Sequence, residues 1–307
     1  MSLHKSRALV APILLSACVV AQSLCYPAAA TRDVQEPAPQ GGSCKPLAAS
    51  GDSPYNEFPP RPYGLGPDSA WGDLTIQAPG RYCLKNDLSL HKALAIAEGG
   101  WKKSHATAVL TLYVGADAGD GSLDIDLGSH VVGSRQEGMT GVSSTSNWPV
   151  SIHDGSIRLA GRAIGVNLEP DLPTSNPPSF RLHDVAIRTG GTGVKLSGRG
   201  SVIRHCVIEV ESQAAIDAAG EGLLIEDNTI IVHGGVADQP PIVLRHADGA
   251  IVRRNKIFYA HFFGPDRASA VRLEDSKHVQ MLDNTLQGFT TLLSEEHPDQ
   301  TPPAGSE

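Results

Sequence analysis

Aromatic side chains are scarce in this sequence, which contains 6 Phe, 6 Tyr and 3 Trp among 307 residues. A core would therefore have to consist mainly of Val, Ile, Leu and Ala. Basic residues are also in deficit, because 25 Lys and Arg stand against 33 Asp and Glu, for a net charge of −8. This balance argues against a nucleic-acid partner, since such proteins gain affinity by neutralising phosphates. Hydrophobic residues make up 40% of the chain, which excludes wholesale disorder.

Long apolar runs are absent after residue 30, so the sequence predicts no transmembrane segment. The first residues predict an export signal instead, because Lys5 and Arg7 precede an uncharged apolar stretch at 8–20. Two cleavage sites are open. Cys18 ends a lipoprotein-type box and would then be lipidated, whereas 28–30 is an ordinary small-x-small site. We expect an exported protein that is periplasmic, anchored to the outer membrane by a lipid, or extracellular.

Cysteines are few, and no Cys-x-x-Cys pair is present. Redox catalysis and structural zinc are therefore not expected. Export leads to an oxidising compartment, where Cys44 and Cys83 could form a disulfide that joins a Pro-rich segment to the body of the fold. Cys206 lies between apolar residues, which predicts a buried thiol.

The body of the sequence is a repeat of short apolar–polar alternations. The units 225–230, 252–257 and 281–286 share the pattern apolar-x-x-Asn-x-apolar. The fourth residues of six such units fall at 155, 185, 206, 228, 255 and 284, and a second alternation precedes them at 166/168, 194/196, 216/218, 242/244 and 271/273. Alternation by two predicts strands, and the spacing fits rungs of three strands and three turns. Stacked rungs form a solenoid whose inward residues make continuous apolar columns.

The recurrent Asn228, Asn255 and Asn284 predict a structural column at one turn of this solenoid. Asn tolerates the left-handed backbone conformation that tight turns require. Stacked about 4.8 Å apart, the side-chain amides can also donate hydrogen bonds to one another along the stack.

These units resemble the right-handed parallel β-helix proteins of the pectate-lyase-like superfamily. The resemblance also rests on Gly-Arg-Tyr-Cys-Leu at 80–84 and on Asp-Leu-Gly-Ser-His-Val-Val-Gly at 126–133. It implies an all-β fold, a right-handed parallel β-helix of about seven to eight rungs with a short N-terminal extension. The expected organisation is a signal peptide at 1–30, a Pro/Gly-rich linker and extension at 31–72, the β-helix at 73–293 and a flexible tail at 294–307.

The superfamily resemblance is specific for the fold and leaves the activity open. Its members include pectate and alginate lyases, polygalacturonases, epimerases and non-catalytic surface proteins. The triple-Asp pattern of the polygalacturonases and the Asp-Pro-His signature of the alginate epimerases are both missing from this sequence. Chemistry must therefore be inferred from individual columns of residues.

The resemblance implies a substrate groove along the first strand of each rung. The outward residues there read Asn167, Lys195, Asp217, Val243 and Arg272, and the next outward positions read Glu169, Ser197, Ala219, Arg245 and Glu274. Loop insertions at 169–179, 233–241 and 259–269 would wall this groove. The last of them contains Tyr259 and His261, and its aromatic rings are candidates to stack on sugars.

Three kinds of chemistry fit this groove. A uronate lyase needs a base and a cation that neutralises the sugar carboxylate, for which Lys195 and Arg272 or Arg245 are the candidates. A glycoside hydrolase needs two carboxylates, which Asp217 and an acid two rungs away would supply. In a non-catalytic protein, Lys195 and Asp217 would simply form a surface ion pair.

A third column lies beside the Asn turn. It reads Asp154, Asp184, His205, Asp227, Arg254 and Asp283, with His153, His183, Arg204, Glu226 and Arg253 alongside. Calcium requires six to eight oxygen ligands in one place, whereas Arg254 and His205 interrupt these acids. His153 and His183 have no obvious third partner for zinc. We therefore expect a mixed-charge ladder, with no metal and no cofactor.

Taken together, the sequence predicts an exported β-helix that binds an acidic polysaccharide. The residues expected to act in β-elimination are Lys195, Asp217 and Arg272. Substrate contacts are expected from Asn167, Arg245, Glu274, Tyr259 and His261. A scaffold that binds a glycan or a protein without cleaving it, and a glycoside hydrolase, are the alternatives.

Overall fold

A computed structural model of the chain describes residues 44–47, 74–76, 78–90, 95–97, 100–102, 108–112, 121–170, 177–234, 239–260 and 267–296. All of them belong to the unit Gly42–Glu307. The predicted leader with Cys18, the loop residue His261, the tail beyond 296 and most of the linker lie outside the described residues. The described part of the chain has no helix that is long and apolar enough to cross a membrane.

Fifteen strands form sheet A. Its first arm consists of β1 (Lys45–Leu47), β3 (Gly80–Leu84), β8 (Leu123–Asp126), β11 (Val150–Leu159), β13 (Phe180–Thr189), β15 (Val202–Arg204), β18 (Leu224–Glu226), β21 (Ile251–Arg253) and β24 (Gln280–Leu282). Its second arm consists of β4 (Leu88–Leu90), β9 (Val131–Ser134), β16 (Val207–Val210), β19 (Thr229–Val232), β22 (Lys256–Tyr259) and β25 (Thr285–Gln287). The long strands β11 and β13 pass through both arms, so the arms meet at a corner in the middle of each rung.

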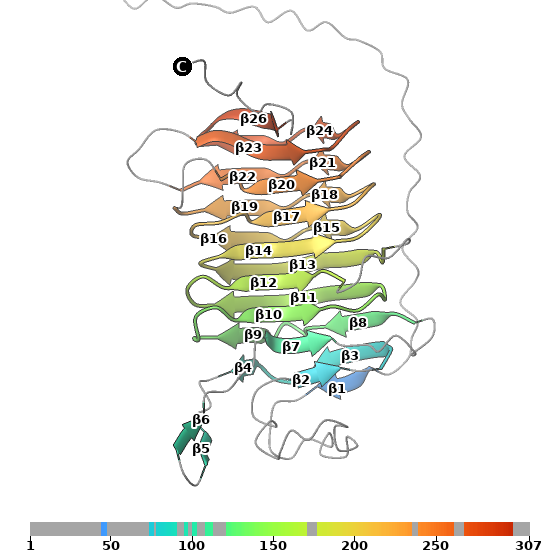
Figure 1. Cartoon of the computed structure of the whole chain (residues 1–307), viewed down its shortest axis with the longest axis vertical. Coiled ribbons are helices and arrows are strands. Elements are labelled where there is room, and N and C mark those ends of the chain that lie inside the picture. The colour runs from blue at the N-terminus through green and yellow to red at the C-terminus, as the bar shows by residue number, and fades with distance from the viewer. Residues whose placement is uncertain are drawn as a thin grey trace, which may run out of the picture. The chain divides into compact units, whose positions relative to one another are not determined.

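Nine strands form sheet B. They are β2 (Leu74–Ile76), β7 (Ala108–Leu112), β10 (Thr140–Ser144), β12 (Ile164–Leu168), β14 (Thr192–Ser197), β17 (Ile216–Ala219), β20 (Ile242–Arg245), β23 (Arg267–Glu274) and β26 (Phe289–Glu296). The short β5 (Ala95–Ala97) and β6 (Gly100–Lys102) pair with each other in antiparallel fashion. Each turn of the chain therefore adds one strand to sheet B and then crosses both arms of sheet A, and Figure 1 shows these strands stacked in chain order.

The pairing register confirms the repeat that the sequence predicts. Gly155 pairs with Val185 in sheet A, and Val166 pairs with Val194 in sheet B. The strands of both sheets pair in parallel from rung to rung. The fold is thus all-β, with long parallel sheets that are consistent with a β-helix solenoid.

Aliphatic columns fill the interior between the sheets. In the second arm of sheet A, one inward column pairs successive isoleucines that are at most 1% exposed: Ile157, Ile187, Ile208, Ile230 and Ile257. β-Branched side chains pack well on such a pleated surface, and each buried side chain contributes about 1.5–3 kcal/mol. This stacking explains how a chain with few aromatic residues builds its core.

Glycines mark the close approach of consecutive rungs where sheet B begins. A Cβ atom on Gly165 would lie 2.4 Å from the carbonyl oxygen of Gly193 and 2.6 Å from Cγ2 of Ile187. Gly141 and Gly193 meet the same kind of neighbours in their own rungs. At these positions the backbone of the next rung occupies the space that a side chain would need.

We expect Gly165→Ala to lower the free energy of unfolding by about 3 kcal/mol, because the added methyl group overpacks a rigid backbone contact. Urea denaturation of the purified protein measures this loss. Gly200→Ala serves as the comparison, since no atom lies within 4 Å of its Cβ position and only its left-handed φ of 63° is strained. That variant is expected to lose about 1 kcal/mol, and equal losses would contradict the packing explanation.

Candidate functional site

The outward column of sheet B has the order that the sequence predicts. Asn167 lies opposite Lys195, and Lys195 lies opposite Asp217. The column continues through Val243 to Arg272 on β20 and β23. A polymer laid along the stack would meet one of these positions at each strand spacing of about 4.8 Å.

Six charged residues on this face form what we call the charged strip: Glu169, Lys195, Asp217, Arg245, Arg272 and Glu274. Nζ of Lys195 lies 2.7 Å from Oε2 of Glu169. The Arg245 guanidinium contacts the Asp217 carboxylate through Nη1 and lies 2.8 Å from Oε2 of Glu274 through Nε. Nε of Arg272 lies 2.9 Å from Oε1 of the same Glu274. Asp217 is therefore ion-paired with Arg245, rather than with its register neighbour Lys195.

The strip is half-buried and electrically balanced. Its side chains range from 18% exposed for Asp217 to 37% exposed for Glu169 and Arg245. Three cations face three carboxylates, so the paired charges hold donors and acceptors in fixed positions. Such an array suits a ligand that carries both hydroxyl groups and carboxylates.

Burial disfavours two polar groups on this face, the Asp217 carboxylate and the side-chain oxygen of Asn167. Burial raises the pKa of the Asp217 carboxyl, although Arg245 and Lys195 oppose the shift. The side-chain oxygen of Asn167 is buried and accepts no hydrogen bond from the described residues. A buried acceptor without a donor costs about 1–3 kcal/mol, so a ligand hydroxyl placed beside Asn167 would relieve that cost.

Tyr259, which the sequence predicts to contact a substrate, lies at the end of a sheet A strand. Tyr259 ends β22 in sheet A, and its ring packs on Phe289 with 6.2 Å between the ring centroids. The structure therefore does not bring Tyr259 to the charged strip. His261 lies outside the described residues.

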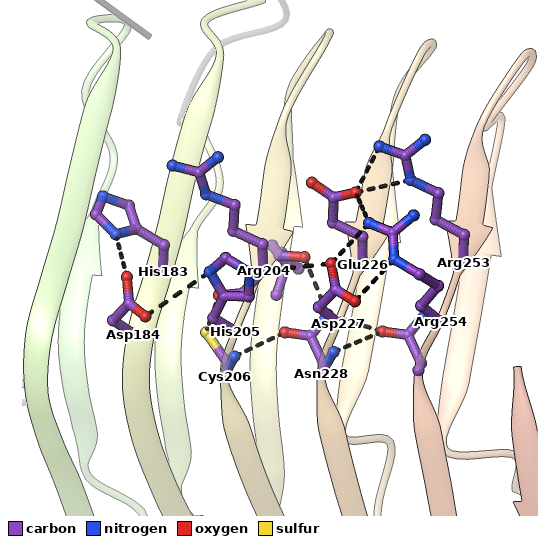
Figure 2. A network of polar contacts seen from close by, with 12 residues as sticks. His183, Asp184, Arg204, His205, Cys206, Glu226, Asp227, Asn228, Arg253 and Arg254 are labelled. Carbon is purple, nitrogen blue, oxygen red and sulfur yellow. Dashed lines mark hydrogen bonds and ion pairs between the residues drawn. The ribbon is translucent and has the colours of Figure 1, made fainter. Parts of the chain in front are cut away.

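The third charged column of the sequence lies at the corner of sheet A (Figure 2). Its residues adopt left-handed φ values of 51–58°: Asp154, Asp184, His205, Asp227, Arg254 and Asp283. Successive side chains of this column approach one another across rungs, because His205 lies 3.8 Å from Asp184 and 3.9 Å from Asp227. Arg254 continues the series at 2.7 Å from Asp227 and, through its hydrogen bond, lowers the pKa of that carboxyl. These contacts form the mixed-charge ladder that the sequence predicts.

The Asn column lies directly beside this corner. Oδ1 of Asn255 accepts hydrogen bonds from the backbone N–H and from Nδ2 of Asn228, at 3.0 and 2.9 Å. Oδ1 of Asn284 accepts the same two bonds from Asn255. Cys206 takes the next place in the column, where its backbone N–H donates to Oδ1 of Asn228. Its side chain is a buried free thiol, as predicted, and burial raises its pKa to about 12.

A buried histidine contacts two acids near the start of the corner, and a third acid lies close by. Nε2 of His153 lies 3.0 Å from Asp124, and Nδ1 lies 2.8 Å from Asp154. The hydrogen bond to Asp124 is the main reason that the pKa of His153 rises to about 9. Asp126, His153 and Asp154 place possible metal-ligand atoms within 4.8 Å of one another. Both ring nitrogens of His153 are already within hydrogen-bond distance of carboxylate oxygens, so the contacts present here form a polar cluster.

A disulfide joins Cys44 to Cys83 and so links the first described residues to β3, with 5.7 Å between the Cα atoms.

Sequence reasoning missed a cluster of arginines on the second arm of sheet A. The signal was present, because Arg158 and Arg188 each follow a repeat reference position, 155 and 185, by three residues.

Comparison of the chain with known protein families, with curated proteins and with solved structures finds no match. Its function must therefore be inferred from its own geometry. On sheet B, the charged strip offers the largest group of partly exposed ionic side chains for contact with a ligand.

Proposed function

We propose that the chain is an exported, right-handed parallel β-helix of the pectate-lyase-like type that binds an acidic polysaccharide along the charged strip. About seven to eight rungs would make up the helix. The leader at 1–30 would direct export, and cleavage before Cys18 would add a lipid anchor at the outer membrane. Cleavage after residue 30 would leave the protein free in the periplasm or outside the cell.

The observation that carries this proposal is the charge on the outer face of sheet B. Faces of parallel sheets are usually covered by other elements and are therefore apolar. Here Lys195, Arg245 and Arg272 present cationic groups on three different strands, at partial exposure. Uronate carboxylates could exchange with Glu169 and Glu274 as partners of these cations, and a guanidinium accepts a carboxylate in bidentate geometry.

Binding to short uronate oligosaccharides tests the proposal. We expect Lys195→Gln and Arg272→Gln each to weaken binding about tenfold or more, because each removes a charge-assisted hydrogen bond. Calorimetric titration with oligogalacturonate and with oligoalginate measures the dissociation constants. Lys256→Gln is the matched control, since Lys256 is an exposed lysine on β22 of sheet A. If that variant lost as much affinity as the strip variants, binding would reflect net charge alone.

A second candidate is cleavage of the bound polymer, which the raised pKa of Asp217 favours. A raised pKa moves a carboxyl toward the range in which a general acid works, and a hydrolase also needs a second, ionised carboxylate. Glu274 lies on the other side of Arg245 and is the candidate for that role. For β-elimination, Lys195 would be the base and Arg272 the carboxylate clamp, but the Lys195 ammonium would first have to leave Glu169.

Two assays on the same digest separate these reactions. β-Elimination produces an unsaturated uronate that absorbs in the ultraviolet, whereas hydrolysis produces new reducing ends without that absorbance. Loss of either signal in Asp217→Asn would support catalysis at the strip. An oligosaccharide that binds and stays intact over prolonged incubation would identify the chain as a non-catalytic binding protein.

A further inference from the structure

The second arm of sheet A and the turns that follow it line a cavity of about 470 Å³. Its walls come from the ends of β9, β11, β13, β16 and β19 and from the residues that follow them. Arg135, Arg158 and Arg188 line it in the earlier rungs, and Glu209, Glu211 and His233 line it in the later ones. We call this cavity the arginine cleft.

The register places like charges next to each other in the cleft. Arg158 lies directly opposite Arg188, and both side chains point outward and are exposed. Like charges that face each other on adjacent strands are destabilising. On its other side, Arg158 lies opposite Gly133, which offers no carboxylate.

Among the described residues, the acids of the cleft form an ion pair with only one of its arginines, Arg188. Nε of Arg188 lies 3.7 Å from Oε1 of Glu209, and that same oxygen lies 2.6 Å from Nε2 of His233. Within the ranges that the structure describes, neither Arg135 nor Arg158 has a side-chain hydrogen bond or an ion pair. Two guanidinium groups therefore face the cavity with their donors available to a ligand.

We propose that the arginine cleft binds an oxyanion carried by a saccharide: a carboxylate, a sulfate or a phosphate group. A guanidinium presents planar, paired donors that match the oxygens of such groups. A bound anion between Arg158 and Arg188 also offsets their mutual repulsion. Glu211 and His233 at the other end of the cavity provide an acceptor and a ring nitrogen for sugar hydroxyls, and the volume lies within the usual range of small-molecule sites. This site is independent of the charged strip, because it lies on sheet A.

Calorimetric titration of the whole chain at low ionic strength tests the cleft with three probes: inorganic phosphate, oligogalacturonate and a sulfated glycosaminoglycan oligosaccharide. We expect Arg158→Gln and Arg188→Gln each to weaken binding of the preferred probe about tenfold or more. Arg199→Gln is the control for net charge, because its side chain is 63% exposed against 70% for Arg188, and it too pairs with a single glutamate. The probe that binds most tightly identifies the anionic group.

Each outcome of this experiment decides the proposal. Weakening in the two cleft variants with Arg199→Gln unchanged supports it, whether or not Lys195→Gln also weakens binding of a glycan at the strip. Three results overturn it: no probe binds the wild-type chain, Arg199→Gln weakens binding as much as the cleft variants, or only Lys195→Gln weakens it. The last result would leave the strip as the binding site and remove the cleft.

Discussion

Asn255→Ala is expected to lower the free energy of unfolding by about 3–5 kcal/mol. Asn255 is 0% exposed, and its amide serves both neighbouring rungs. Its removal leaves the backbone N–H of Asn228 without an acceptor and the carbonyl of Ile225 without a donor. Each buried group of this kind costs about 1–3 kcal/mol. Urea denaturation at neutral pH measures the loss, which is a large part of the stability of an ordinary domain.

Asn284→Ala is the matched control for this prediction. Asn284 makes the same kinds of bonds one rung later, with Nδ2 donating to the carbonyl of Val252, but it is partly exposed. Water can therefore replace its amide, and a loss of about 1 kcal/mol is expected. If Asn255→Ala cost no more than Asn284→Ala, the buried column would not be a structural element of the fold.

The second large effect is a fall in stability at alkaline pH, caused by His153. Its side chain is only 10% exposed and lies between Asp124 and Asp154, while Arg81 lies beside Asp124 at 3.4 Å. Because the folded pKa is raised from 6.5 to about 9, the folded state binds more protons than the unfolded state between these values. The contribution is fully present below about pH 6.5 and is lost as the pH rises through about 9. Its size is on the order of 3 kcal/mol.

Denaturation curves measured from pH 6 upward check this prediction, with His153→Gln as the test variant. We expect the wild-type chain to lose stability over that window, whereas the variant starts less stable and changes little. His205→Gln is the control, because His205 is 50% exposed and its carboxylate neighbours are more distant, at 3.8 and 3.9 Å. A wild-type pH profile that ran parallel to that of His153→Gln would show that His153 does not bind the extra proton.

The sequence predicted the parallel stacking of the strands because the repeat determines the register. Once Asn228, Asn255 and Asn284 are aligned, the two-residue alternation decides which side chains point inward. The order Asn167, Lys195, Asp217 follows in the same way, and the structure confirms it. These features depend on backbone periodicity, which a single sequence displays directly.

Ion partners were harder to predict, because long side chains reach beyond their register neighbours. Lys195 selects Glu169 over the adjacent Asp217, and Arg245 reaches back one strand to Asp217 as well as forward to Glu274. The hydrogen-bond partner that most raises the pKa of His153 is Asp124, which comes 29 residues earlier in the chain. The arginines of sheet A follow from the same alignment, which places Arg158 beside Arg188, but their shared cavity depends on the turns between the sheets.

A crystal structure of the chain in complex with a uronate oligosaccharide tests the central claim most directly. We predict sugar density along the charged strip, with carboxylate oxygens within hydrogen-bond distance of Lys195 and Arg272 and a hydroxyl beside Oδ1 of Asn167. Density confined to the arginine cleft would assign glycan binding to sheet A and contradict the role of the strip. Crystals that remain free of sugar at saturating oligosaccharide, with the strip exposed to solvent, would contradict the proposed function itself.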